Sequence, residues 1–142
     1  MKSIVFVCTG NTCRSAMAAA IAKKLCNERA LNVKIDSCGL AAPVGSPASE
    51  NASLALSELY GIDLSSHKAA QATAELLDGA DIIFTMTPQH ASALSSIPSL
   101  CGKLRCAQPP IADPYMQDLS VYKKAAEQLY SQIDSLLSEV AK

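Results

Sequence analysis

The chain opens with a short apolar run that meets a polar, glycine-containing loop, and this junction constrains the fold more than any other feature. Ser3 to Val7 reads SIVFV, a β-branched and aromatic run that is typical of a strand buried on both faces. The loop CTGNTCR follows, and an Ala-rich stretch of high helix propensity begins at Ser15. Strand, loop and helix in this order predict the opening of a βαβ unit.

The rest of the chain continues this alternation. We expect further strands at residues 33–37, 81–86 and 103–106, and helices at residues 50–60, 73–79, 88–97 and 121–140. Ser49 is a candidate cap for the helix at 50–60, and Gly61 its stop. Alternating strands and helices imply a parallel sheet covered on both faces, with right-handed crossovers. Without a linker or repeat, the 142 residues form one α/β domain, residues 1–142.

Composition and charge exclude several classes of function. A net charge of -1 argues against binding of a nucleic-acid backbone. No apolar run reaches the roughly 20 residues that span a bilayer, and the N-terminus lacks the layout of a signal peptide, so we expect a cytoplasmic protein without membrane contact. The six cysteines include no CxxC pair and the chain has two histidines, which makes catalytic or buried thiols a better expectation than disulfides or a zinc site.

The loop after the first strand carries chemistry that is typical of anion binding. A loop that enters a helix N-terminus turns several backbone N–H groups inward, and Arg14 adds a planar fork that fits two phosphate oxygens. Facing that positive field, Cys8 is expected to exist largely as a thiolate, with Ser15 placed to donate a hydrogen bond to it. Gly10 and Asn11 tolerate the positive φ that such a loop needs. The alternative is a buried cysteine at a strand end and an arginine on a helix surface.

Five segments together resemble one enzyme family almost from end to end. They are VCTGNTCRSAM, IDSCGL, GIDLSSHKAAQ, IFTMTPQH and ADPYMQDLSVYKKAAEQL, and they are similar to motifs of the low-molecular-weight protein tyrosine phosphatases. The resemblance implies a single-domain, four-stranded parallel sheet flanked by helices, with a phosphate-binding loop after the first strand. It also implies hydrolysis of a phosphomonoester or phosphoramidate with no metal and no cofactor.

The resemblance assigns roles to individual residues. Cys8 is the nucleophile, Arg14 holds the phosphoryl oxygens, and Asp113 protonates the leaving group and later activates the water that hydrolyses the phosphocysteine. Asn11, Ser37 and His67 brace the loop by hydrogen bonds. Residues that bind phosphate or substrate are Thr9, Gly10, Asn11, Thr12, Cys13, Ser15, Leu40 and Tyr115. Taken alone, Asp113 also fits an ordinary Asp-Pro turn.

Four positions depart from the family pattern or have no match in it. Ala16 and Ala19 stand where the family commonly has Pro and Glu, and Ala70 stands where Arg is frequent. His90 has no matching role and is assigned to a solvated helix face.

Thr12 and the cleft walls bear on the substrate. Members that act on phosphotyrosine typically carry a bulky aliphatic residue at the position of Thr12. A threonine at this position resembles the bacterial protein-arginine phosphatases of the family. The walls supply one aromatic ring, Tyr115, with apolar contact expected from Leu40. Asp113 and Asp118 are expected near the mouth, where they balance a guanidinium charge. We therefore expect hydrolysis of phosphoarginine in proteins; the alternative for Thr12 is a merely tolerated loop residue.

Three other activities stay open at this point. A phosphotyrosine phosphatase of the same family is the first alternative. An arsenate reductase is suggested by Cys101 and Cys106, although the segment between them has no close match to that enzyme. A cysteine phosphocarrier is disfavoured because its loop needs neither Arg14 nor an Asp-Pro acid. The expected partners are phosphorylated proteins, with inorganic phosphate as product and inhibitor.

The second thiol of the loop, Cys13, lies five residues after the nucleophile. A thiolate that attacks phosphorus is also easily oxidised, so we expect Cys13 to trap Cys8 as a reversible disulfide. The alternative is that Cys13 is a small packing residue.

Overall fold

The computed structural model describes residues 2–141 and shows a parallel sheet of four strands. The strands are β1 (Lys2–Cys8), β2 (Val33–Gly39), β3 (Ile82–Thr85) and β4 (Leu104–Cys106), in the spatial order β2-β1-β3-β4. Every neighbouring pair is parallel, with β1 between β2 and β3. The expectation of a single-domain α/β fold with helices on both faces is confirmed.

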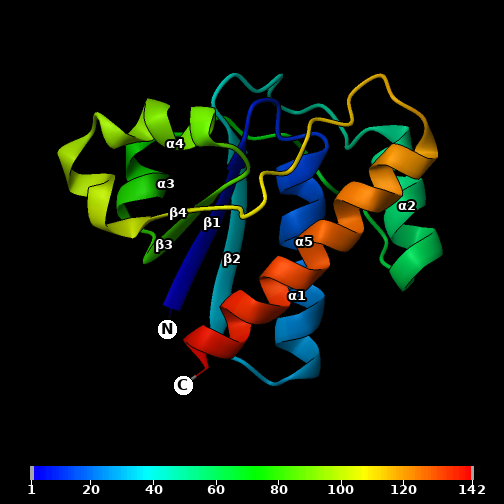
Figure 1. Ribbon diagram of the computed structural model, residues 1–142, viewed down its shortest axis with the longest axis horizontal. Coiled ribbons are helices and arrows are strands. Elements are labelled where there is room, and N and C mark those ends of the chain that lie inside the picture. The colour runs from blue at the N-terminus through cyan, green and yellow to red at the C-terminus, as the bar shows by residue number, and fades with distance from the viewer. Residues whose placement is uncertain (1, 142) are drawn as a thin grey trace.

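Helices cover the two faces of the sheet unequally. One face packs against α1 (Arg14–Glu28), α2 (Glu50–Tyr60) and α5 (Leu119–Val140), which together build the larger core. The other face packs against α3 (Ala74–Asp78), α4 (Pro88–Ser95) and the short 3-10 helix η1 (Pro98–Lys103). Figure 1 shows these two groups on opposite sides of the strands. No helix within residues 2–141 is both long enough and apolar enough to cross a membrane.

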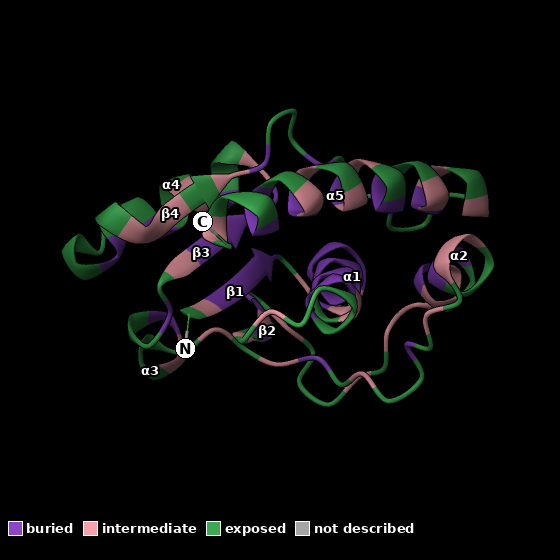
Figure 2. Cartoon of the chain, turned by 90° about the horizontal axis from the view of Figure 1, so that it is seen from below, coloured by how far each residue is buried: buried purple, intermediate pink, exposed green. Residues whose placement is uncertain are grey.

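The first strand and first helix are the most buried elements. Ile4 and Phe6 point into the larger core, while Val5 and Val7 point into the smaller one, so β1 is apolar on both faces. Helix α1 lies under α5 and is buried around most of its circumference (Figure 2). This rigid strand and helix hold the loop between them from both ends.

The observed element boundaries differ from the expected ones by a few residues. The last helix begins at Leu119, two residues early, because the side chain of Asp118 caps it by accepting from the Val121 N–H at 3.4 Å. Helix α4 ends at Ser95 because the chain turns into the 3-10 helix that begins at Pro98. Ser49 occupies the N-cap position of α2, but its hydroxyl makes no capping hydrogen bond.

Candidate functional site

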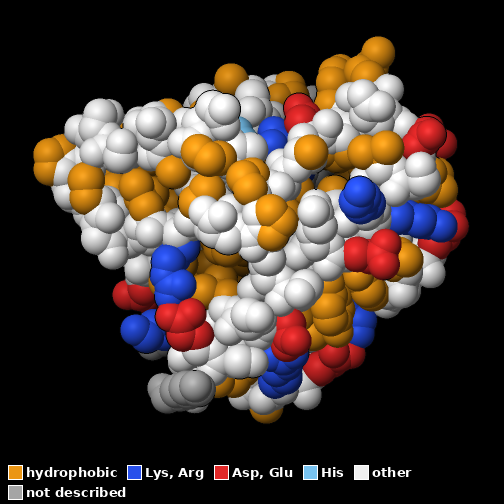
Figure 3. All heavy atoms as spheres, viewed as in Figure 1, with side chains coloured by type: hydrophobic (Ala, Val, Ile, Leu, Met, Phe, Trp, Pro, Cys, Tyr) orange, Lys and Arg blue, Asp and Glu red, His pale blue; other side chains and the backbone are white. Residues whose placement is uncertain are grey.

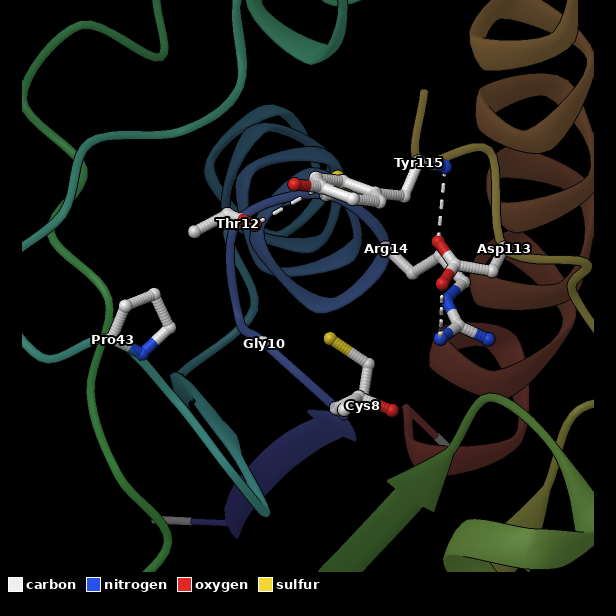
Figure 4. Close-up of a pocket in the computed structure, with 9 residues that line it drawn as sticks. Cys8, Gly10, Thr12, Arg14, Pro43, Asp113 and Tyr115 are labelled. Carbon is white, nitrogen blue, oxygen red and sulfur yellow. Dashed lines mark hydrogen bonds and ion pairs between the residues drawn. The ribbon is translucent and has the colours of Figure 1, made fainter. Parts of the chain in front are cut away.

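The loop between β1 and α1 forms the floor of a cleft of about 260 Å³ at the carboxyl end of the sheet. Its walls come from the loop after β2 and from the loop before α5 (Figure 4). The lining residues are Cys8, Thr9, Gly10, Thr12, Cys13, Arg14, Pro43, Asp113 and Tyr115. Segments far apart in the sequence therefore meet at the thiol of Cys8.

Asn11 is the internal brace of the loop. Its backbone has a φ of 57°, a left-handed conformation that asparagine adopts more readily than most residues, and the residue is fully buried. The side-chain amide donates to Ser37 Oγ at 2.9 Å and accepts from the Ala70 N–H at 2.8 Å. His67 Nε2 donates to the Asn11 carbonyl at 2.6 Å. Asn11 thus holds the loop from behind instead of lining the cleft, and Gly10, against expectation, does not have a positive φ.

A short hydrogen bond supports the sulfur of Cys8. Ser15 Oγ lies 2.8 Å from Cys8 Sγ and accepts a hydrogen bond from Asn11 Nδ2 at 2.8 Å. Its own proton therefore points to one of two acceptors, the sulfur or the Cys38 carbonyl at 3.4 Å. The shorter contact is to the sulfur, and the Asn11 N–H adds a second donor at 3.3 Å. Both donors stabilise a thiolate at this position.

A glycine at the end of β2 lets the loop approach the sheet. A Cβ on Gly39 would lie 2.4 Å from the Thr9 carbonyl oxygen, closer than a side chain permits, and 3.0 Å from the Asn11 nitrogen. The residues after Gly39 also bond to the start of the loop. The Leu40 N–H donates to the Cys8 carbonyl at 3.0 Å, and the Ala41 N–H donates to the Thr9 carbonyl at 2.9 Å. Sequence reasoning treated Gly39 only as a strand end, although the motif IDSCGL contained it.

Arg14 is buried and aimed at the cleft. Nη1 of its guanidinium donates to the Ile111 carbonyl at 3.1 Å, and Nη2 lies 3.7 Å from Asp113 Oδ2. The carboxylate of Asp113 is about half exposed, and its Oδ1 accepts from the Tyr115 N–H at 3.0 Å. One oxygen of Asp113 is therefore fixed in its own turn, while the other lies beside the guanidinium of Arg14 (Figure 4).

Cys13 is a buried part of the wall of the cleft. Its sulfur contacts Ser49 Oγ at 3.4 Å and Tyr122 OH at 3.7 Å, while the Thr12 hydroxyl lies 3.8 Å away. Burial raises the pKa of Tyr122, so its hydroxyl stays protonated beside Cys13 and Ser49. The hydroxyl of Ser49 thus contacts the sulfur of Cys13 and does not cap α2.

Two residues expected at the mouth of the cleft lie elsewhere. Leu40 shares a face with Cys38, two residues earlier, and packs against the smaller core, so the expectation that it lines the cleft is wrong. Pro43 takes its place. Asp118 is committed to capping α5, and hydrogen bonds from Ser120 and the Val121 N–H lower the pKa of its carboxyl.

The remaining thiols do not reach the cleft. Burial, together with the neighbouring charges of Cys8 and Asp36, raises the pKa of Cys38 to about 12, so this thiol stays protonated. Cys101 is exposed beside α4, and its thiol donates to the Ser95 carbonyl at 3.1 Å. Within residues 2–141, no three His, Cys, Asp or Glu side chains converge in a way that could hold a metal ion.

His90 belongs to the site, and the assignment to a solvated helix face is wrong. The residue is 6% exposed, in the first turn of α4. Its Nε2 lies 2.9 Å from Thr9 Oγ1 on the loop, and its Nδ1 lies 3.1 Å from the hydroxyl of Thr87, the cap of the same helix. The only sequence signal was its position, a few residues after the carboxyl end of β3. His90 therefore braces the loop at Thr9, whereas Ser37, His67 and Ala70 brace it at Asn11.

The environment of His90 predicts a pH dependence of stability. Burial first, and then the charge of Arg14, lower the pKa of His90, while Asp113 opposes this effect. The unfolded chain therefore takes up a proton at about pH 6.5 that the folded chain resists, and stability falls as the pH drops below that value. We expect the wild-type Tm to fall more steeply between about pH 7 and about pH 5 than the Tm of His90→Asn. Parallel curves for the two proteins would contradict this account.

Comparison with known proteins identifies relatives of the whole chain. Residues 3–142 match the family model described as low molecular weight phosphotyrosine protein phosphatase. A protein-arginine-phosphatase of Bacillus subtilis is 33% identical, over 98% of this chain and 94% of the relative. A probable low molecular weight protein-tyrosine-phosphatase, EpsP of Ralstonia nicotianae, is 32% identical over 99% and 97%. The crystal structure of a low molecular weight protein tyrosine phosphatase from T. tengcongensis superimposes with a TM-score of 0.94 at 38% identity, covering 98% of this chain and 99% of that one.

Proposed function

Because the chain belongs to the low molecular weight phosphotyrosine protein phosphatase family, we propose that it removes phosphate from phosphoarginine in proteins through a phosphocysteine intermediate. The observation that carries the substrate assignment is Thr12, a short hydroxyl-bearing side chain that lines the same cleft as the reactive thiol. The family itself supports a protein phosphatase, while its members carry the names of both arginine and tyrosine phosphatases.

In the proposed reaction, two displacements at phosphorus share one set of residues. The sulfur of Cys8 attacks the phosphorus, the N–P bond of phosphoarginine breaks, and Asp113 gives its proton to the departing guanidine nitrogen. Asp113 then takes a proton from a water that attacks the phosphocysteine, so the S–P bond breaks and inorganic phosphate and the thiolate form. Arg14 and the loop N–H groups hold the non-transferred oxygens in both steps. The same cradle binds the product, so we also expect inhibition by inorganic phosphate.

Shape and charge at the cleft favour a guanidinium group. Thr12 leaves more space than a bulky aliphatic residue would, and its hydroxyl can bond a guanidinium nitrogen. The ring of Tyr115 offers a face on which a guanidinium stacks. Once Asp113 has given up its proton, its carboxylate balances the charge of the departing guanidinium. The wall made by Pro43 supplies no second aromatic ring, so a phenyl group would stack on Tyr115 alone and bind more weakly.

A phosphotyrosine phosphatase is the second candidate, and the observation in its favour is Tyr115. Its ring lines the cleft and is about 61% exposed, so it is free to stack on the phenyl ring of a bound phosphotyrosine. The same ring serves either substrate, which is why Thr12 must carry the distinction.

The test compares phosphoarginine and phosphotyrosine peptides of one sequence, with wild type and Thr12→Ile. We expect wild type to prefer phosphoarginine, and Thr12→Ile to shift the ratio of the two kcat/KM values toward phosphotyrosine by about tenfold, the effect of one to two methylene groups in a pocket. Phosphate release measured for both peptides gives the ratio directly.

A matched variant separates the size of Thr12 from its hydroxyl. Thr12→Val keeps the branched shape and removes only the hydroxyl. If the hydroxyl binds the guanidinium, Thr12→Val should shift the ratio in the same direction as Thr12→Ile. Hydrolysis of phosphotyrosine but not phosphoarginine by the wild-type protein would overturn the substrate assignment and leave the phosphatase assignment intact.

Two further expectations also stay predictions. Cys8 and Cys13 are free thiols in this structure, and a disulfide between them requires the sulfur of Cys13 to leave Ser49 and Tyr122. We also propose a cytoplasmic location, where phosphorylated proteins are the substrates and thiols stay reduced.

A further inference from the structure

Exposed apolar residues follow directly on residues that line the cleft. Among residues 2–141, five large hydrophobic residues are exposed, and the three most exposed are Val44 at 72%, Tyr115 at 61% and Met116 at 83%. Tyr115 lines the cleft, Met116 follows it, and Val44 follows the lining residue Pro43. We call Pro43, Val44, Tyr115 and Met116 the apolar rim. Figure 3 shows hydrophobic side chains at the upper edge of the molecule, where the loop before α5 lies in Figure 1.

Met116 keeps its exposed position at a conformational cost. Its φ is 65°, a left-handed conformation that favours glycine and strains a residue with a Cβ. The turn is closed by a hydrogen bond from the Gln117 N–H to the Pro114 carbonyl at 2.9 Å, next to the bond that fixes Asp113. A strained residue with almost no contacts in the folded protein points to a contact made with something else.

The position of the apolar rim indicates what that contact is. A phosphoryl group held by the loop places the phosphorylated side chain across the cleft, so the polypeptide that carries it must pass over the mouth. Val44 and Met116 directly follow lining residues of two different walls, the loop between β2 and α2 and the loop before α5. A small phosphorylated molecule would leave both side chains in water.

We propose that the apolar rim binds apolar side chains next to the phosphorylated residue of a protein substrate. This inference rests on the proposed protein phosphatase function and adds a sequence preference to it. Contact with Met116 removes apolar area from water only when a polypeptide is bound, so it raises kcat/KM for polypeptides without affecting isolated phosphoamino acids.

The experiment uses phosphopeptides whose two residues on either side of the phosphoresidue are leucine or serine, made with phosphoarginine and with phosphotyrosine. Wild type is expected to show a kcat/KM about tenfold higher for the leucine peptide, and Met116→Asn is expected to reduce that ratio to about twofold. Asparagine tolerates the left-handed backbone, so the turn and Asp113 keep their places. Hydrolysis of the free phosphoamino acid should be unchanged.

Ile97→Asn is the matched control, because Ile97 is also exposed but lies between α4 and η1, away from the cleft. It should keep the tenfold preference, and a Tm for Met116→Asn no lower than that of wild type shows that the fold is intact. Equal rates on leucine and serine peptides would overturn the inference about the rim. A dimer that dissociates on Met116→Asn would also overturn it, since the rim would then bind a second copy. Failure to hydrolyse either phosphoresidue would instead refute the proposed function.

Discussion

Replacement of Cys8 by serine is expected to lower kcat/KM for a phosphopeptide by about 100,000-fold or more, the scale on which loss of a nucleophile acts in hydrolases with covalent intermediates. The site stabilises a negative sulfur through Ser15 and the Asn11 N–H, and a serine hydroxyl is not ionised near neutral pH. The variant keeps the size of the side chain, so binding should persist while turnover stops. Phosphate release and a binding titration with the same peptide measure the two effects separately.

Cys101→Ser is the control for this variant. Its thiol is exposed beside α4 and does not line the cleft, so phosphatase activity should stay within about twofold of wild type. A Cys8→Ser protein that retained one-hundredth of the activity would contradict the assigned nucleophile. Loss of activity in Cys101→Ser would instead favour a role for the later cysteines, as in an arsenate reductase.

Replacement of Arg14 by lysine is expected to lower kcat/KM by about 1,000-fold, within the range reported for arginines that stabilise a transferring phosphoryl group. The charge remains, but the planar fork is lost and with it the ability to hold two phosphoryl oxygens at once. Lysine also has a single nitrogen, so it cannot bond the Ile111 carbonyl and face the cleft together as the two Nη atoms do. Steady-state kinetics with wild type and variant measure the loss.

Arg105→Lys provides the comparison, because Arg105 pairs with Glu139 on the surface at the far edge of the sheet. Its kinetics should match wild type, since an exposed pair contributes roughly 0 to 1 kcal/mol and lies outside the cleft. If Arg14→Lys lost no more than tenfold, the charge alone would explain the role of Arg14 and the bidentate account would be wrong.

The loop owes its rigidity to contacts from three directions. Ser37 and Gly39 approach from β2, His67 and Ala70 from the segment after α2, and His90 from α4. The hydrogen bonds among these contacts all end on Thr9 or Asn11, the first and third residues after Cys8. Donors that are fixed before the substrate arrives need no reorganisation during the reaction, which is the condition under which they stabilise a transition state best.

Sequence reasoning located the elements and the main residues of the cleft for identifiable reasons. The run SIVFV, buried on both faces, marked β1, and the change to a helix-forming composition placed the loop between a strand and a helix. Cys8 and Arg14 lie on that one loop, so local spacing sufficed to bring them together. Asp113 required the resemblance to a family, because nothing local distinguishes it from any Asp-Pro turn.

The misplaced residues share a different cause. His90 and Leu40 each occupy segments whose local pattern fits the assigned environment, yet His90 is buried against Thr9 and Leu40 faces the smaller core. Asp118 has the expected charge but does not line the cleft, and its carboxylate caps the first turn of α5. In each case the outcome depended on the direction of a side chain relative to a distant segment.

The sequence by itself determined the order of strands and helices and the chemistry carried on the loop after β1, because periodicity, helix propensity and the spacing of Cys8 and Arg14 act over a few residues. The tertiary structure alone decided that Gly39 must lack a side chain, that His90 braces the loop, and that Pro43 and Tyr115 line one cleft. These facts depend on close approach between segments that are 30 to 80 residues apart, and such approach is set by how the helices pack on the two faces of the sheet.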